Sequence, residues 1–501
     1  MIVNRSVLSN LALALPFVLL LAIDCWHHDM WGDELHAWGL TVGSGSLAEL
    51  FQNLHYEGHP GLWNLLLWIP SRLSPSPVGM QLVNFAVGTA IILMIGLASP
   101  FSRIEKILLL LNYFVVFEYT VLARNYGIGL LLAMLYAVVR RGATERPVLA
   151  GLLLGAMANT NVYALFLSGF LALEYGWSRV FGGDRPNWTA LVRLVPGGVL
   201  YCALLLLAVL TLLPPSDITN QLKPSVEINL DEVARFGLAA LHTLVAPFTP
   251  IDFGFPASFA FPGNWFEHGR RVLAAACLLP FILTAQWAIL RHSKPLLLAL
   301  AGTALITTVF AVLIYPAVIR HLGVMFIGFI VALWLLRGRL PVRSWPVLGL
   351  LTLGALGGST ALAGQWMRPY AVNDEAVRWL RSNGFAETPI VSDKDPLLYT
   401  EPVAILMHRS FYSLDCMCED RFIRFLNRRD GVDPATVPDR LAQITERMGP
   451  GFFILLSGAR LDDARRGEIA TKGLRLTELA YLSGAERVKV TVIYRVDPPA
   501  H

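Results

Sequence analysis

Two acidic side chains follow the first apolar run of the chain and are the first residues that could do chemistry. The run Leu11–Ile23 is about long enough, with its flanks, to cross a bilayer, and Asp33 and Glu34 come soon after it. Trp31 and Trp38 frame the two acids. Carboxylates near a membrane are costly unless they are paired, bound to a metal or used in a reaction. The segment therefore indicates a working site at the membrane surface; the alternative is a hydrated loop anchored by interfacial tryptophans.

A second group of acid–base residues precedes the next apolar segment. Glu57 and His59 stand just before Pro60, which can open a helix without losing a hydrogen bond. We expect both side chains on the membrane face that carries Asp33 and His36. A glutamate and a histidine beside acids suit a divalent cation such as Mg²⁺, Mn²⁺ or Zn²⁺, or acid–base catalysis. A polar loop at a helix entrance is the alternative.

Two arginines at later helix ends have the chemistry to hold a phosphate. Arg124 precedes Asn125 and Tyr126, and Arg320 precedes His321. Guanidinium groups bind phosphate oxygens through two parallel hydrogen bonds. An arginine at a helix end can also extend to lipid headgroups, which is the alternative for each of them. We expect His321 to assist the phosphate contact, with His36, Asn125 and Tyr126 as ligands of a sugar or acceptor.

The composition is that of a multi-pass membrane protein. The 501 residues are 55% hydrophobic and only 15% charged, with a mean hydropathy of +0.55. The net charge of +4 is modest and gives no indication of nucleic acid binding. We interpret the first apolar run as a retained helix, because no small-residue cleavage site follows it.

Further apolar segments, with the first, predict about 11–12 membrane segments in residues 1–363. They lie near 61–73, 78–98, 107–122, 124–139, 148–158, 161–176, 189–213, 271–290, 295–315, 322–336 and 344–363. Basic residues between them mark the cytoplasmic loops: Arg140, Arg141 and Arg146; Arg179, Arg185 and Arg193; Arg291 and Lys294; Arg337, Arg339 and Arg343.

The remaining loops then fall on the external side, with one conflict. External positions are expected for the first loop, 24–60, for the long loop 214–270 and for everything after about 364. Three apolar runs lie between Asp33 and Arg124, but three complete membrane spans would place these two residues on opposite sides. The run 61–73 is too short to be a secure span. Within the long loop, Leu230–Val245 has helical spacing.

Residues 364–501 differ from the rest and predict a soluble α/β domain on the external side. Half of the charged residues of the chain lie there. A helix is expected at Asp374–Asn383, and strands at 389–393, 451–457, 474–482 and 487–496. Cys416 and Cys418 lack further ligands at zinc spacing, which leaves a local disulfide as the open alternative.

The order of these motifs resembles the GT-C glycosyltransferases, in particular the branch with protein O-mannosyltransferases and the lipid A aminoarabinose and galacturonosyl transferases. The shared features are a Trp-Gly-Asp-Glu motif after the first helix, a His-Pro-Gly-Leu-Trp helix entry, an external Ala-Arg-Asn-Tyr and a late Arg-His. The resemblance covers roughly residues 1–360. It implies an inverting sugar transfer from a polyprenyl-phosphate donor to a lipid, glycan or protein acceptor. It also implies that Asp33 lies near the acceptor or serves as the base, and that Glu57 binds a metal. We therefore expect Asp33, as base, and Glu34 to be the catalytic residues.

The sequence thus predicts a GT-C-like enzyme of the bacterial inner membrane with a periplasmic C-terminal domain. It departs from many relatives in having Glu-Gly-His-Pro-Gly before the second helix entry. One alternative is a transporter or flippase for lipid-linked glycans, which needs polar elements near the bilayer midplane. Asn159–Asn161 is the candidate for such an element. Another alternative is a structural subunit whose external domain binds a partner.

Overall fold

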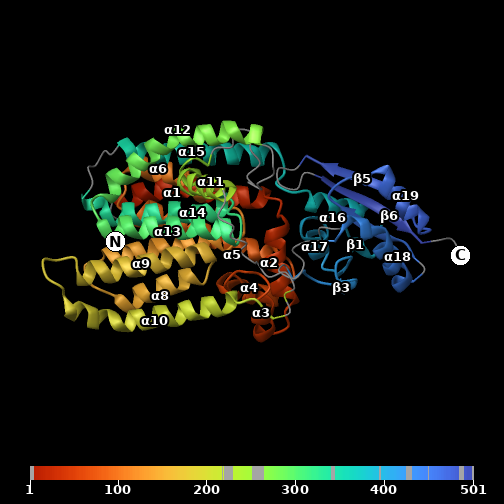
Figure 1. The fold of residues 1–501 in the computed structure, drawn as a ribbon, viewed down its shortest axis with the longest axis horizontal. Coiled ribbons are helices and arrows are strands. Elements are labelled where there is room, and N and C mark those ends of the chain that lie inside the picture. The colour runs from red at the N-terminus through yellow and green to blue at the C-terminus, as the bar shows by residue number, and fades with distance from the viewer. Residues whose placement is uncertain are drawn as a thin grey trace.

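A computed structural model describes residues 5–216, 218, 230–250, 265–339, 345–393, 396–424, 432–449, 451–484 and 490–498. Most of the predicted loop 214–270, apart from Leu230–Val245, and the start of the last predicted strand lie outside these residues. Long helices run side by side in one part of the molecule, and a mixed sheet with its own helices forms the other (Figure 1). The change in composition near residue 364 falls close to the boundary between the two parts.

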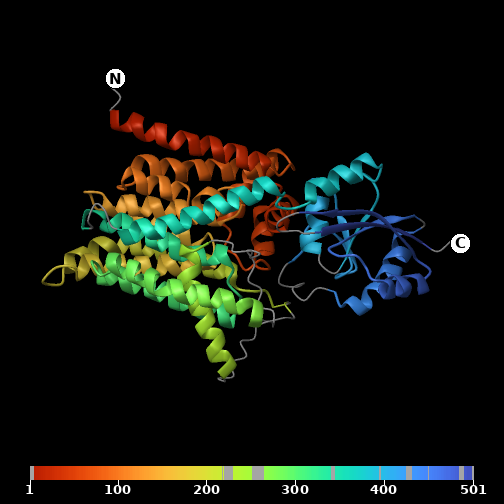
Figure 2. The same cartoon turned by 90° about the horizontal axis from the view of Figure 1, so that it is seen from above.

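Seven described helices are long and apolar enough to cross a membrane, so the chain is a multi-pass membrane protein. They belong to α1 (Arg5–His27), α5 with η1 (Val78–Leu93 and Met94–Ala98), α10 (Trp188–Leu212), α12 (Trp265–Leu290), α13 (Lys294–Leu313), α14 (Ile319–Leu336) and α15 (Trp345–Met367). α14 is buried along most of its length and forms the centre of the bundle. Seen from above, α1 runs from the far end of the bundle toward the sheet (Figure 2).

Exposed tryptophans mark both ends of the bundle. Trp26 and Trp366 lie at the end that meets the sheet, and exposed tryptophans at the other end adjoin the basic loops: Trp177, Trp188, Trp287 and Trp345. Exposed leucines and valines cover the surface between them, for example Leu19 and Val199. Tryptophan belts of this kind sit at the two membrane–water interfaces. The pattern indicates that the two ends of the bundle lie at the two membrane–water interfaces.

Further helices complete the bundle. They are α6 (Arg103–Leu110), α7 (Tyr126–Arg141), α8 (Pro147–Ala158), α9 (Val162–Val180), α11 (Leu230–Val245) and the short η3 (Ala246–Phe248) and η4 (Arg337–Arg339). The helix expected inside the long loop coincides with α11. The segment expected near 107–122 is broken into α6 and the π-helical η2 (Phe114–Glu118). Asn112 makes the break, because its side-chain oxygen accepts a hydrogen bond from the Phe114 backbone N–H.

The conflict over residues 61–73 is resolved by three helices that do not cross the bundle: α2 (Gly32–Gly43), α3 (Leu47–Leu54) and α4 (Leu62–Leu73). The Arg72 guanidinium, in the last turn of α4, donates to the carbonyls of Thr41 and Ser44. Just after α4, the Pro75 carbonyl accepts from the Trp38 indole. α4 therefore stays beside α2 throughout, and Asp33 and Arg124 can share one face.

The C-terminal part is a six-stranded sheet in the order β3-β2-β1-β4-β6-β5. The strands are β1 (Ile390–Ser392), β2 (Phe411–Ser413), β3 (Cys418–Asp420), β4 (Phe453–Ser457), β5 (Arg475–Ser483) and β6 (Val490–Asp497). The helices are α16 (Asn373–Ser382), α17 (Pro396–Leu406), α18 (Val437–Met448), α19 (Asp463–Thr471) and the short η6 (Pro434–Thr436). β1 is parallel to β2 and β4, and the other pairs are antiparallel.

The sequence predicted α16, β1, β4, β5 and β6 but missed the short β2 and β3. These two strands have three residues each, too few for a period-of-two pattern. A disulfide joins Cys416 and Cys418 just before and at the start of β3.

Trp31 joins the two parts of the molecule. Its side chain is 2% exposed and belongs to the same apolar cluster as Val372, Val377 and Val403 of the C-terminal part. The next residue, Gly32, leaves room for the chain there: a Cβ at this position would lie 2.5 Å from the Leu397 carbonyl oxygen. Replacement of Gly32 would therefore force α2 and α17 apart.

We expect Trp31→Ala to lower the free energy of unfolding by about 3–5 kcal/mol, because a buried indole leaves a cavity. Thermal unfolding in detergent would measure the change. Trp26→Ala is the matched control, since Trp26 is 92% exposed, and it should unfold like the wild type. Equal unfolding temperatures for the two variants would show that Trp31 does not hold the C-terminal part.

Candidate active site

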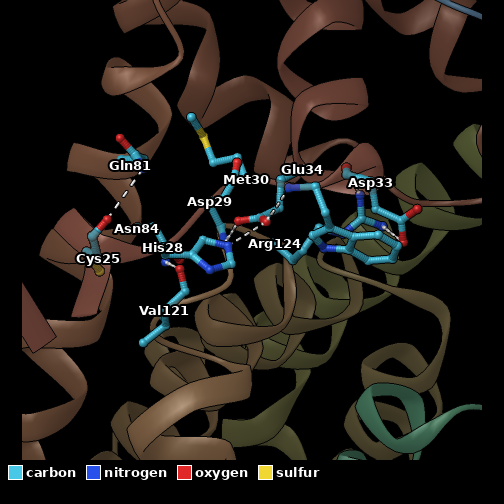
Figure 3. A network of polar contacts seen from close by, with 12 residues as sticks. Cys25, His28, Asp29, Met30, Asp33, Glu34, Gln81, Asn84, Val121 and Arg124 are labelled. Atoms are coloured by element: carbon cyan, nitrogen blue, oxygen red, sulfur yellow. Dashed lines mark hydrogen bonds and ion pairs between the residues drawn. The ribbon is translucent and has the colours of Figure 1, made fainter. Parts of the chain in front are cut away.

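Asp33 lies between two arginines at the end of the bundle that faces the sheet. Its carboxylate Oδ2 is 2.8 Å from Nη2 of Arg320 and 4.0 Å from Nη2 of Arg124. Arg124 also donates to the backbone carbonyl of Asp33 (Figure 3). The convergence expected from the sequence is therefore present. Asp33 comes from the first turn of α2, Arg124 from the loop before α7 and Arg320 from the first turn of α14.

Each guanidinium is held by its surroundings and keeps a polar atom unused. The Arg320 side chain lies over the Trp31 ring at 5.2 Å, and its carbonyl accepts from the Tyr119 hydroxyl at 2.7 Å. Asn84 positions the Arg124 loop by donating to the carbonyls of residues 120 and 121. The Nε atoms of Arg124 and Arg320 are both buried and have no hydrogen-bond partner in the part of the chain that the structure describes. The two cations thus have capacity for an anionic ligand.

Both carboxylate oxygens of Glu34 are occupied by contacts within the protein. The residue is 0% exposed, and its Oε1 accepts from the Ala123 backbone N–H at 2.6 Å. Its Oε2 accepts from the Trp31 N–H and lies 2.8 Å from Nε2 of His28 (Figure 3). These contacts fix the residue before Arg124 against the start of α2. They favour a positioning role for Glu34 in place of the catalytic one expected from the sequence.

His36 is enclosed by two carboxylates, one from each part of the molecule. Its Nδ1 lies 2.8 Å from Glu401 of α17, and its Nε2 lies 2.7 Å from Glu57. Burial lowers the pKa of His36, but Glu401 and Glu57 outweigh burial and raise it well above its ordinary value. Both ring nitrogens are engaged, so none is left for the sugar or acceptor contact expected from the sequence.

Charge disfavours the metal expected at Glu57 and His59, although each residue keeps one ligand atom available. Glu57 Oε2 pairs with His36, whereas Glu57 Oε1 and His59 Nδ1 are buried without a hydrogen-bond partner among the described residues. His59 lies beside Arg124 and Arg320, and burial together with these cations lowers its pKa to about 3. A divalent cation would be repelled by the same two guanidiniums. The geometry therefore favours His59 as a neutral group of the arginine site.

The remaining predicted ligands lie around Arg320 or support its neighbours. His321 Nδ1 accepts from the Val318 backbone N–H at 3.2 Å, and its ring is 6.0 Å from that of Tyr126. Asn125 donates to the Thr160 carbonyl at 2.9 Å, which ties the start of α7 to the α8–α9 loop. Asn125 is thereby a structural contact through its amide nitrogen, and Tyr126 and His321 face the site.

Sequence reasoning missed three contributors: His28, Tyr163 and Glu401. Glu401 carried a signal, because a lone acid within the apolar segment 396–407 needs a buried partner. His28 stands close to the acids along the chain, but its pairing with Glu34 depends on the turn between them. Tyr163 reaches the site by stacking on His321, with ring centroids 4.7 Å apart. No sequence pattern indicates that stack.

Comparison with known proteins yields weak structural similarity and no match in sequence. No protein-family model and no curated protein matches the chain. Among solved structures, it is similar to the single-particle cryo-EM structure of arabinofuranosyltransferase AftD from Mycobacteria, with 16% sequence identity and a TM-score of 0.39. The match covers 100% of this chain but only 40% of that one. A TM-score this low does not establish a shared fold, so a functional assignment has to rest on the site.

His36 should make the protein less stable as the pH rises. Its pKa in the folded state is raised above the ordinary 6.5, so its stabilisation is complete below about pH 6.5 and is lost as the pH rises through the raised value. Removing the cation leaves two buried carboxylates, and we expect His36→Gln to cost about 3 kcal/mol or more at neutral pH.

Thermal unfolding between pH 6 and 10 checks this expectation. His36→Gln should unfold at a lower temperature at pH 7 and should lose part of the wild-type decline above it. The exposed His27 supplies the control variant, His27→Gln, which should keep the wild-type profile. An unchanged profile in His36→Gln would mean that His36 is not a buried cation.

Proposed function

We propose that this chain transfers a sugar from a polyprenyl-phosphate donor to a hydroxyl group of a lipid, glycan or protein acceptor, with inversion at the anomeric carbon. The observation that supports the proposal is the Asp33 carboxylate between Arg124 and Arg320, at the end of an apolar bundle. The site would face the periplasm of a bacterial inner membrane. A polyprenyl tail suits the apolar bundle, and its phosphate suits the two guanidiniums.

The reaction needs a base and a stabilised leaving group. The acceptor oxygen attacks the anomeric carbon, its proton passes to the Asp33 carboxylate, and the bond between the anomeric carbon and the phosphate oxygen breaks. Arg124 and Arg320 hold the polyprenyl phosphate as its negative charge develops. Inversion requires attack from the face opposite the phosphate, and no covalent enzyme intermediate forms. The two arginines supply the positive charge that a metal would otherwise provide.

Asp33 has two roles in this scheme, one before and one after the donor binds. In the free chain, its carboxylate neutralises Arg320 at 2.8 Å and occupies the place that suits a phosphate. The donor phosphate replaces that ion pair, which frees the carboxylate to accept a proton. Binding the donor first would therefore activate the base.

The transporter alternative receives less support from the geometry. The polar segment Asn159–Asn161, its candidate for a midplane element, forms the α8–α9 loop at the end of the bundle. The Asn159 carbonyl accepts from the Leu62 backbone N–H at the start of α4, beside the active-site helices. The structural-subunit alternative leaves the paired charges around Asp33 without a purpose.

Asp33→Asn should reduce sugar transfer by about 10²–10⁴-fold, because an amide cannot take the acceptor proton. Donor binding should persist, since Arg124 and Arg320 remain. Transfer from a radiolabelled polyprenyl-phosphate sugar in proteoliposomes, with donor binding measured in parallel, tests both statements.

Glu49→Gln is the control for this experiment, because Glu49 is an exposed acid on the neighbouring helix α3. It should retain wild-type transfer. Full transfer by Asp33→Asn would remove Asp33 as the base, and failure of the wild type to bind or use any polyprenyl-phosphate sugar would remove the proposed function.

A further inference from the structure

Two buried tyrosines beside the arginine site have hydroxyl groups without partners among the described residues. Tyr126 is 3% exposed and Tyr163 is 2% exposed, and neither hydroxyl makes a hydrogen bond within that part of the chain. A buried hydroxyl without a partner is costly, and functional sites are where such groups persist. Tyr126 is within electrostatic reach of Arg320, Arg124 and Asp33, so its hydroxyl belongs to the site.

His321 joins the two tyrosines and has a defined proton position. Its Nδ1 accepts from the Val318 backbone N–H, so a neutral ring carries its proton on Nε2 and donates from there. The ring stacks on Tyr163 with an interplanar angle of 13° and also contacts Tyr126 and Tyr315. The stack limits rotation of the imidazole. The cluster therefore offers one fixed donor and two phenols that can donate or accept.

The groups of this cluster suit a ligand that carries hydroxyl groups. The two phenols can donate or accept and the imidazole donates, so sugar hydroxyls can pair with all three. Such pairing would leave none of these buried polar groups without a partner.

We propose that Tyr126, Tyr163 and His321 form the subsite for the sugar of the donor, and that this subsite pairs with hydroxyl groups of the sugar. The inference rests on the proposed function for the polyprenyl-phosphate part of the donor. It adds Tyr163 to the site and assigns the tyrosine hydroxyls to sugar hydroxyls. Buried polar groups built to pair with a substrate hydroxyl discriminate strongly against ligands that leave them unpaired.

Tyr163→Phe tests the proposal because it keeps the ring and the stack on His321 and removes the hydroxyl. We expect the affinity for a short-chain polyprenyl-phosphate mannose to fall by about 5- to 30-fold, which corresponds to one lost hydrogen bond. Affinity for the same polyprenyl phosphate without a sugar should stay at the wild-type value. The unfolding temperature should be equal or higher, because a buried hydroxyl without a partner has been removed.

Tyr201→Phe is the matched control. Tyr201 is also a buried tyrosine, but its hydroxyl pairs with Ser168 at 3.3 Å between α9 and α10. This variant should bind both lipids like the wild type.

Two results would overturn the inference. Tyr163→Phe could leave binding of the mannose donor unchanged, or it could weaken the sugar-free lipid as much as the mannose donor; in both cases the hydroxyl does not contact the sugar. If the wild type binds neither lipid, the proposed function fails as well, so the two failures are distinguishable.

Discussion

The candidate active site depends on one ion pair, between the Asp33 carboxylate and the Arg320 guanidinium, at the end of an apolar helix bundle. Both side chains are largely buried, with 15% and 14% of their surfaces exposed. A charge in such a place requires a partner, and the pair satisfies two charges at once. The same mutual dependence creates a reactive site, because an anionic ligand that binds Arg320 releases the carboxylate. Arg124 adds a second cation. The two guanidiniums therefore favour an anionic ligand over a neutral one in the place of the Asp33 carboxylate.

Much of the surrounding structure positions Asp33, Arg124 and Arg320 relative to one another. Glu34 links the start of α2 to the residue before Arg124, and the Tyr119 hydroxyl holds the carbonyl of Arg320. The C-terminal part contributes through Trp31 and through Glu401, which reaches His36 on α2. These contacts explain why a soluble α/β part packs on the membrane part near the site. It orients α2, and hence Asp33.

The sequence was sufficient for the parts of the fold that follow from hydrophobicity and charge. Apolar runs predicted the long helices, and basic loops placed Asp33, Arg124 and Arg320 on one face. The path of 61–73 could not be predicted, because an interfacial helix and a short span have similar composition.

The roles of Glu34 and His36 were also beyond sequence reasoning. The hydrogen bond from Ala123 to Glu34 spans 89 positions, and the contact between His36 and Glu401 spans 365. Local sequence patterns identify an acid or an imidazole as capable of chemistry. They do not reveal that a residue distant in sequence already forms a hydrogen bond with that side chain.

The most direct test is the lipid retained by the protein when the proposed base is removed. Mass spectrometry of Asp33→Asn, purified from its own membrane, should detect a bound polyprenyl-phosphate sugar, and the double variant Asp33→Asn/Arg320→Ala should lose it. Absence of any polyprenyl phosphate from the single variant, or equal retention by the double variant, would contradict a site built on Asp33 and Arg320.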